Sequence, residues 1–251
     1  MIIREWSDSF ELIEQHEHAR LSGAVCAFWG DPAVKTSLWE AVILAVKEHD
    51  RAWIPLDKQP LWNEAKQRPF SFTDYPMNEK INAYANGVDE IERINPYAAL
   101  LGSLHYASFF TSNETKMGKE FYEQEQKRQD KLRGRGARTG FETEHLNILQ
   151  FCDDISLYSC LNQPGVSKEK EYPWFKNGFR QRFDYLGKKK MHAGWRSTQD
   201  IEITPFPLAQ RLSFTLRSWR VSKQDCKKTG LAAAWKKREQ IKTFITFHPP
   251  S

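Results

Sequence analysis

Three histidines of this chain extend the apolar stripes of three different predicted helices, and this feature restricts the fold more than any other. Each lies three or four residues from an apolar neighbour: His18 from Leu21, His49 from Ala45 and His105 from Leu101. Residues at that spacing share one helix face, so the three imidazoles should point into the protein. Because a buried imidazole without a partner costs free energy, the fold must give each histidine its own hydrogen-bond partner or bring the three together.

Two aspartates favour the second arrangement. Asp50 follows His49 directly, and Asp153 lies four residues after Leu149 on the apolar face of another predicted helix. An ionised carboxylate on such a face needs a cation or hydrogen-bond donors. Imidazole and carboxylate ligands together suit zinc, manganese, iron, nickel or cobalt, so the sequence predicts one or two divalent transition-metal ions. The predicted ligands are His18, His49, Asp50, His105 and Asp153.

Helical periodicity dominates the first two thirds of the chain. Apolar residues recur at helical spacing over the segments 15–29, 38–50, 77–94, 97–110 and 141–161. The segment 53–76 is too rich in proline for regular structure and too apolar for a free linker, so it should cover the helices. Its aromatic side chains either line a substrate mouth or serve only in packing. They are Trp53, Trp62, Phe70 and Phe72.

The C-terminal part of the chain changes character. Segments 200–207, 212–221 and 240–247 alternate with the period of half-buried strands, and 240–247 is expected at the edge of the sheet. We therefore predict a mainly α fold. It consists of a helical domain over residues 1–198 and a small C-terminal antiparallel β element over residues 199–251, packed on that domain.

Composition limits the class of protein. Hydrophobic residues make up 40% of the chain and charged residues 27%, which excludes a disordered protein. No apolar run approaches the ~18 residues of a membrane span, and the N-terminal residues lack a secretory signal, so we expect a cytoplasmic protein without a membrane partner. The cysteines form no C-x-x-C pair and should be buried and reduced. They are Cys26, Cys152, Cys160 and Cys226.

The charge balance is compatible with an anionic substrate. Lys and Arg number 37 against 32 Asp and Glu, which gives a formal charge of +5 (37 − 32). This mild excess fits a small anionic substrate, including a phosphorylated one, and equally an ordinary soluble surface. The run 188–190 of three lysines fits a charged turn better than a nucleic-acid site, so we expect no nucleic-acid partner. Nothing in the sequence indicates an oligomeric state.

The order of the predicted ligands resembles the HD-domain superfamily of metal-dependent phosphohydrolases, over roughly residues 15–160. Four strings are also similar to a bacterial family catalogued only as a domain of unknown function, which itself looks HD-like. They are Gln-His-Glu-His-Ala-Arg-Leu-Ser-Gly at 15–23, Glu-His-Asp-Arg-Ala-Trp at 48–53, Ser-Leu-His-Tyr-Ala-Ser at 103–108 and Cys-Asp-Asp-Ile-Ser-Leu-Tyr at 152–158. The resemblance implies that the helical domain is an HD-like bundle.

The resemblance also implies a role for each ligand. His18, His49 and Asp153 would bind one ion, Asp50 would bridge that ion to a second, and His105 matches an extra histidine of some members. Adjacent helical residues diverge by ~100°, so a His-Asp doublet can span two neighbouring ions. Asp50 is therefore the predicted catalytic residue, which would also accept a proton from the attacking water.

Other polar residues near the ligands have different interpretations. His105 could also be a core histidine bonded to a carbonyl group. His16 points ~200° away from His18 on a helix and should lie at the surface. Asp154 points ~100° away from the apolar stripe and should face a helix end or solvent. His145 either supports the ligands or is a capping or exposed residue.

Three classes of function compete at this point. The first is hydrolysis of a phosphoester or nucleotide by a metal-activated water. The second is an HD-type diiron oxygenase, because some HD-like proteins with similar ligands activate dioxygen. The third is a non-catalytic sensor or interaction protein that keeps a structural metal ion or none.

Overall fold

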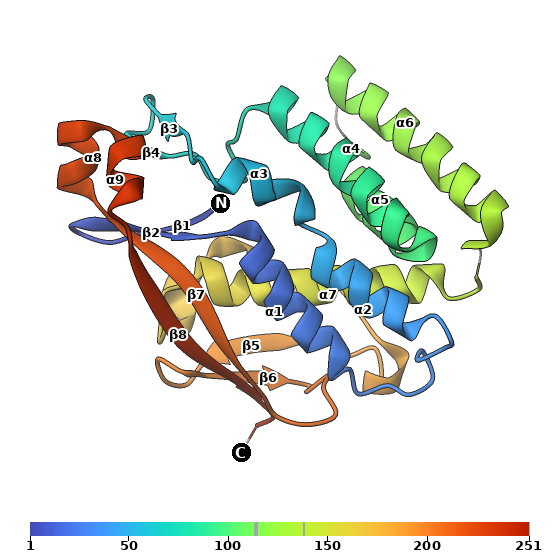
Figure 1. Ribbon diagram of the computed structural model, residues 1–251. Coiled ribbons are helices and arrows are strands. Elements are labelled where there is room, and N and C mark those ends of the chain that lie inside the picture. The colour runs from blue at the N-terminus through green and yellow to red at the C-terminus, as the bar shows by residue number, and fades with distance from the viewer. Residues whose placement is uncertain (113–114, 138, 251) are drawn as a thin grey trace.

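Helices pack against a six-stranded mixed sheet, and residues of both contribute to one core (Figure 1). The structure is a computed structural model that describes residues 1–112, 115–137 and 139–250. The strand order is β1-β2-β7-β8-β6-β5. The strands are β1 (Ile2–Glu5), β2 (Ser9–Ile13), β5 (His192–Trp195), β6 (Asp200–Thr204), β7 (Leu212–Ser222) and β8 (Glu239–His248). Neighbouring strands are antiparallel except β6 and β8, which are parallel.

The five predicted helices are confirmed. They are α1 (Gln15–Ala27), α2 (Trp39–Glu48), α4 (Met77–Ile94), α5 (Pro96–Ser108) and α7 (Glu142–Leu161). The remaining elements include α3 (Ile54–Asp57), α6 (Lys116–Leu132), α8 (Lys223–Thr229), α9 (Leu231–Lys236) and a hairpin of β3 (Trp62–Asn63) and β4 (Arg68–Pro69). Local sequence determines where α5 starts: the Asn95 side chain accepts a hydrogen bond from the Ala98 N–H, and Pro96 occupies the first helical position. Helix α1 packs on α2, α7 and β7, which places it between the helical layer and the sheet.

The predicted mainly α fold with a small antiparallel β element is wrong, because the protein is an α/β protein with a large mixed sheet. Strands β6, β7 and β8 confirm the three predicted strands. However, β1 and β2 extend one edge of the sheet and β5 forms the other, so β8 is an interior strand rather than the predicted edge. The division of the chain at residue 198 stays a prediction, although the N-terminal strands join the C-terminal ones in one sheet.

The N-terminal strands were missed because they are only four and five residues long and carry charged residues that turn out to be buried. Phe10 and Leu12 alternate with Ser9 and Glu11 in β2, but all five residues of this strand are buried, so neither of its faces is the solvent face that such a pattern normally marks. Arg4 in β1 and Glu11 in β2 are both buried and form an ion pair of 3.0 Å between Nη1 and Oε1. In the sequence, charged residues indicate an exposed segment, so a buried ion pair makes these two strands difficult to recognise.

The buried Arg4 also joins the sheet to helix α7. Its Nε donates to the Cys160 carbonyl at 2.8 Å, and its Nη2 donates to the Ser159 carbonyl at 2.6 Å. Carbonyl groups in the last turn of a helix have no partner within the helix, so Arg4 satisfies two groups that would otherwise need water. Ser218 in β7 donates to Glu11 at 2.7 Å and completes the network.

Gly23 lets α1 and α2 approach closely. A Cβ atom at this position would lie 2.8 Å from Cβ and 3.1 Å from Cα of Lys47, closer than side chains normally pack. Helix α1 carries His18, and α2 ends one residue before His49. The missing side chain of Gly23 therefore keeps two predicted ligands on neighbouring helices close together.

Gly23→Ala is expected to be ~1–3 kcal/mol less stable than a Gly→Ala change in an open part of a helix, because the new methyl group overpacks the contact between α1 and α2. The matched control is Gly102→Ala in α5, where the nearest side-chain atom would be 3.6 Å away, at Ile91 Cδ1. Both changes gain the same helix propensity, ~1 kcal/mol. Thermal unfolding of the two variants measures the difference, and equal stability would contradict the tight contact.

Two further expectations concern the whole chain. All four cysteines are free and buried, as predicted. In the part of the chain that the structure describes, no helix has both the length and the apolar character needed to cross a membrane.

Candidate metal centre

His18 is held in one orientation by the helix opposite it. The Ser156 hydroxyl in α7 donates to the Asp153 carbonyl at 2.9 Å, which leaves its oxygen to accept from His18 Nδ1 at 2.5 Å. With the proton on Nδ1, the lone pair of Nε2 faces the other ligands. Nε2 lies 2.9 Å from Asp50 Oδ2 and 3.5 Å from Asp153 Oδ1.

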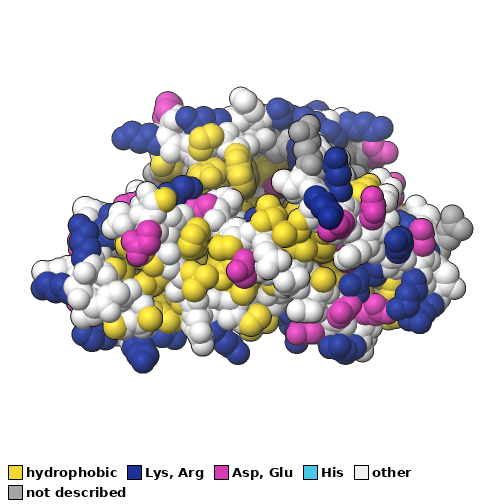
Figure 2. Space-filling view, turned by 90° about the horizontal axis from the view of Figure 1, so that it is seen from above, with side chains coloured by type: hydrophobic (Ala, Val, Ile, Leu, Met, Phe, Trp, Pro, Cys, Tyr) yellow, Lys and Arg dark blue, Asp and Glu magenta, His cyan; other side chains and the backbone are white. Residues whose placement is uncertain are grey.

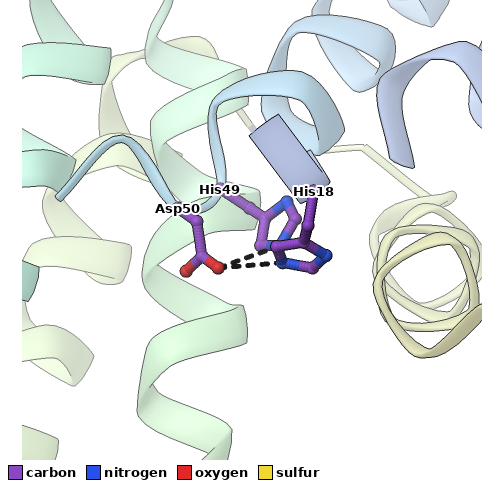
Figure 3. A group of neighbouring side chains, drawn as sticks. All are labelled: His18, His49 and Asp50. Atoms are coloured by element: carbon purple, nitrogen blue, oxygen red, sulfur yellow. Dashed lines mark hydrogen bonds and ion pairs between the residues drawn. The ribbon is translucent and has the colours of Figure 1, made fainter. Parts of the chain in front are cut away.

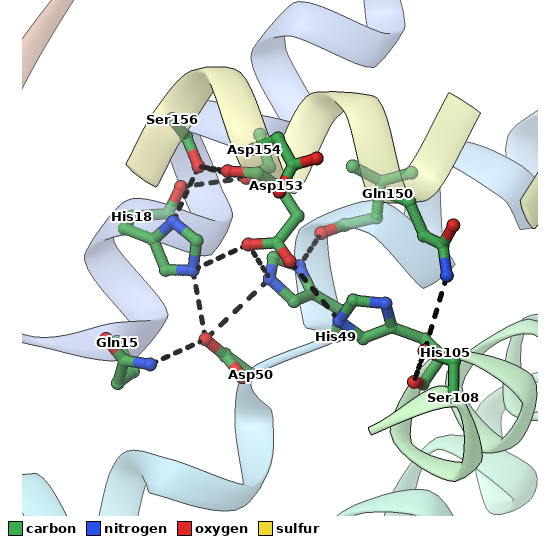
Figure 4. A network of polar contacts seen from close by, with 12 residues as sticks. Gln15, His18, His49, Asp50, His105, Ser108, Gln150, Asp153, Asp154 and Ser156 are labelled. Atoms are coloured by element: carbon green, nitrogen blue, oxygen red, sulfur yellow. Dashed lines mark hydrogen bonds and ion pairs between the residues drawn. The ribbon is translucent and has the colours of Figure 1, made fainter. Parts of the chain in front are cut away.

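His49 is oriented in the same way by the end of its own helix. Its Nδ1 lies 2.6 Å from the Val46 carbonyl, which can only accept, so this nitrogen carries a proton. The other nitrogen, Nε2, is buried and has no hydrogen-bond partner among the described residues. It lies 3.7 Å from Asp50 Oδ2 (Figure 3) and 3.4 Å from Asp153 Oδ1 (Figure 4). A buried nitrogen that faces two carboxylates without bonding to either is well placed to bind a metal ion together with them.

The separations between the two histidines and the two carboxylates are close to those between neighbouring ligands of an ion. Transition-metal ions bind nitrogen and oxygen at ~2.1 Å, so neighbouring ligand atoms are ~3.0 Å apart in octahedral and ~3.4 Å apart in tetrahedral sites. The separations between the histidine Nε2 atoms and the carboxylate oxygens are 2.9, 3.4, 3.5 and 3.7 Å. The ligand atoms of His18, His49 and Asp50 lie within 4.8 Å of one another and therefore fit a metal ion, and Asp153 Oδ1 lies within 3.5 Å of both histidines.

His105 extends this group on the other side of Asp153. Its Nε2 lies 3.5 Å from Asp153 Oδ2, whereas Asp153 Oδ1 faces His18 and His49 (Figure 4). His49, His105 and Asp153 also form a buried triad with ligand atoms within 4.8 Å of one another. Asp153 is therefore the carboxylate that lies between His105 on one side and His18 and His49 on the other. A bridging role for Asp50 stays a prediction. His105 Nδ1 is buried without a partner among the described residues, so the alternative of a carbonyl-bonded core histidine is not seen.

The charges in the centre favour a cation. Burial lowers the pKa of His49, but Asp50 and Asp153 outweigh burial and raise it to about 9. Burial raises the pKa of Asp153, but His49 outweighs that effect and holds it well below the usual range. Burial also lowers the pKa of His105 to about 4, so its imidazole is neutral. Without a metal ion, a proton on His49 supplies the positive charge that the carboxylates require.

Gln15 supports Asp50 from the start of α1. Its Nε2 donates to Asp50 Oδ2 at 3.0 Å, the same oxygen that faces His18 (Figure 4). The sequence interpretation did not include Gln15, or Ser156 as the partner of His18. Both had a signal, because each lies three residues from a predicted ligand on the same helix face.

A cavity of about 620 Å³ opens beside this centre, within the size range of small-molecule sites. His18, Asp50, His105 and Asp153 line it, and His49 lies behind them. Aromatic side chains form much of the remaining wall. They include Trp53, Phe72, Phe109, Trp174, Phe175 and Phe179.

The four aromatic residues of the covering segment divide between two roles. Trp53 and Phe72 line the cavity, as one of the two interpretations predicted. Trp62 packs on Phe10 and Phe70 packs on Tyr75, with ring centroids 6.0 and 6.1 Å apart.

Asp154 lies on the wall of the same cavity, which the sequence interpretation missed. It accepts from Gln181 Nε2 at 2.9 Å and pairs with Arg180 Nε at 3.3 Å. Burial, together with the charge of Asp153, raises its pKa to about 6. The cavity therefore holds a carboxyl group outside the ligand set that can carry a proton near neutral pH.

Two other histidines lie outside the ligand set. His16 is half-buried rather than fully at the surface. His145 is buried, accepts from the Tyr97 hydroxyl at 2.7 Å and donates to the Val34 carbonyl at 2.9 Å. Since both of its ring nitrogens are used in the core, His145 is neither exposed nor a cap.

The family of proteins of unknown function called DUF3891 matches residues 1–223. The chain belongs to this family. Searches of curated proteins and of solved structures gave no match. The resemblance to a domain-of-unknown-function family is therefore confirmed, while the relationship to the HD-domain superfamily is not shown by these comparisons.

The DUF3891 match contains the whole candidate centre. It extends from β1 to the first residue of α8, so all five predicted ligands, Asp154 and the cavity walls lie inside it. Strand β8 lies beyond the match although it pairs with both β7 and β6.

The metal-free DUF3891 protein is expected to lose stability as the pH rises from about 6.5 to about 9. The folded state raises the pKa of His49 from 6.5 to about 9, so it binds this proton more tightly than the unfolded chain does. The stabilisation is complete below the unfolded pKa and is lost as the pH rises through the folded value. Thermal unfolding in the presence of a chelator measures the trend. His49→Gln should remove it, and a rise in stability over this range would contradict the assignment.

Proposed function

We propose that this protein is a metal-dependent hydrolase of a small phosphoester or nucleotide. The observation that carries the proposal is the convergence of His18 Nε2, His49 Nε2, Asp50 Oδ2 and Asp153 Oδ1 beside a cavity large enough for a small molecule. A divalent ion held by these atoms would supply Lewis-acid polarisation of a phosphoryl oxygen and a nucleophilic water near neutral pH. The ion would be zinc, manganese, iron, nickel or cobalt, and His105 allows for a second one.

The protein's own residues divide the remaining work. Ser156 and the Val46 carbonyl hold the two histidines so that their Nε2 atoms face the two carboxylates, and Gln15 holds Asp50. In this proposal Asp50 accepts the proton of the attacking water. Asp154, with its pKa raised to about 6, is placed to hold a proton for the leaving group.

A relationship to the HD-domain superfamily is part of the proposal. Its support is the order of the ligands along the helices: His18 in α1, His49 and Asp50 directly after α2, His105 in α5 and Asp153 in α7. Comparison of an experimental structure with metal-bound HD-domain proteins would test it.

A panel of nucleotides and simple phosphoesters, assayed with each of the five metal ions, tests the hydrolase. We expect phosphate release that depends on the added ion and is lost in His49→Ala. Iron in the purified protein together with oxygen consumption, and no phosphate release, would instead favour the oxygenase. Tight metal binding without turnover of any kind would favour the non-catalytic class.

A further inference from the structure

We propose that the cavity binds a phosphoester whose organic group is aromatic, and that Lys80 recognises its anionic group. This inference rests on the proposed function and specifies the substrate class of the same site. Two observations carry it: apolar side chains left exposed at the cavity, and a lysine at the cavity that has no acidic partner.

The exposed apolar side chains lie where a ligand would cover them. Met77, Phe109 and Trp174 are 38, 46 and 53% exposed, and all three line the cavity. Large apolar side chains gathered around one concave site are typical of a ligand-binding surface. Figure 2 shows hydrophobic side chains around the middle of the face seen from above, with Lys and Arg side chains mainly toward its edges.

The aromatic wall is continuous with the metal centre. Phe72 and Trp174, from segments far apart in the chain, meet edge to face with centroids 6.2 Å apart. On the other side, the Phe109 ring packs edge to face on His105 at 4.7 Å. A flat organic group between these rings would therefore lie beside the ligands, with its ester bond near the centre.

Lys80 is the cation of the cavity that lacks an acidic partner. Its Nζ donates to the Phe72 carbonyl at 3.3 Å, and among the described residues no carboxylate lies within ion-pair distance. The nearby Asp74 is paired with Lys66 at 2.8 Å and Arg68 at 3.0 Å. Burial lowers the pKa of Lys80 and the nearby charge of Asp74 does not outweigh this effect, so a further negative charge beside the ammonium would be favourable. An anion bound in the cavity would supply that charge and accept the remaining N–H groups.

Arg180 is the other cation on the wall, but it is already paired. Its Nε lies 3.3 Å from Asp154 Oδ2, and its side chain is mostly exposed. Arg180 therefore has a carboxyl partner and contact with water, whereas Lys80 has no carboxyl partner among the described residues. This difference makes Lys80 the residue that determines specificity for the anionic group.

Calorimetric titration tests both parts with three probes: 1-naphthyl phosphate, inorganic phosphate and 1-naphthol. A chelator is added so that binding is measured without turnover. We expect 1-naphthyl phosphate to bind at least ~10-fold more tightly than either of the other probes. Lys80→Met, which keeps the apolar stem, should weaken 1-naphthyl phosphate by ~10-fold or more and leave 1-naphthol unchanged.

Three variants complete the test. Lys80→Arg should restore most of the affinity for 1-naphthyl phosphate, and Trp174→Ala should weaken both naphthyl probes but not inorganic phosphate. Lys116→Met, at an exposed position of α6, is the matched control and should change nothing. Equal affinity for 1-naphthyl phosphate and inorganic phosphate in the unaltered protein would overturn the aromatic part, and unchanged binding in Lys80→Met would overturn the role of Lys80.

Failure of this inference differs from failure of the proposed function. If 1-naphthyl phosphate binds with the expected pattern but no phosphoester is cleaved with any metal ion, the hydrolase proposal fails and the binding site stands. If other phosphoesters are cleaved and the pattern is missing, the hydrolase stands and the assignment of Lys80 and the aromatic wall is wrong.

Discussion

The His49→Ala variant is expected to lose its metal ion almost completely, with an affinity more than ~100-fold lower than that of the unaltered protein. The reason is the position of Nε2, which lies 3.4 Å from Asp153 Oδ1 and 3.7 Å from Asp50 Oδ2 and has no other partner among the described residues. Removal of this imidazole takes away one ligand of the ion. It also takes away the group whose positive charge balances the two carboxylates when no ion is bound. Elemental analysis, before and after reconstitution, gives the occupancy.

His145→Ala is the matched control for this loss. His145 is also buried, but it bonds to Tyr97 and the Val34 carbonyl and takes no part in the centre. Both variants should be less stable, because both remove a buried, oriented imidazole. Only His49→Ala should release the ion. Equal metal content in the two variants, or no metal above background in the unaltered protein after reconstitution, would remove the basis for a metal centre.

The Asp50→Asn variant is expected to reduce turnover by ~10²–10⁴-fold even where the ion stays bound. The amide keeps the shape of the side chain and one oxygen, but it can no longer accept a proton from the attacking water. Gln15 donates to the carboxylate oxygen Oδ2 and His18 Nε2 lies 2.9 Å from it, so the charge removed lies at the centre of the site. Phosphate release, measured at matched metal content, gives the effect.

His16→Ala serves as the reference for that measurement. His16 is two residues from His18 and only half-buried, so its loss should change turnover little. If both variants keep near-normal rates, then the His-Asp doublet contributes to packing rather than to chemistry, and the non-catalytic class becomes the better interpretation.

The helices and the grouping of the ligands were predictable from the sequence because both depend on local periodicity. An imidazole on an apolar stripe must be buried, and few arrangements of helices can bury His18, His49 and His105 at affordable cost. The structure brings these three together with Asp50 and Asp153, as the sequence interpretation expected. Periodicity within a helix is enough to say that a side chain points inward.

The features that were not predicted depend on which elements become neighbours in the fold. Periodicity within one element carries no information about its neighbours. Asp154 points away from the apolar stripe of α7, yet the segment carrying Gln181 and Arg180 encloses it. Lys80 looks like a solvated residue of α4 until the loop of Phe72 covers it. Strands β1 and β2 were hidden because Arg4 and Glu11 are charged residues that neutralise each other in the interior. In each case a partner distant in sequence buries a polar side chain that the local pattern assigns to the surface.

Helix α7 has a consequence for hydrogen exchange. It carries Asp153 and Ser156 in the centre, while the carbonyls of Ser159 and Cys160 hold Arg4 of β1. Backbone amides of such a buried helix exchange with solvent mainly when the whole domain opens. A ligand that binds only the closed form suppresses that opening by mass action. An ion bound at Asp153 would therefore slow deuterium uptake in β1 as well, although β1 belongs to the sheet and contacts the C-terminal turn of the helix through Arg4.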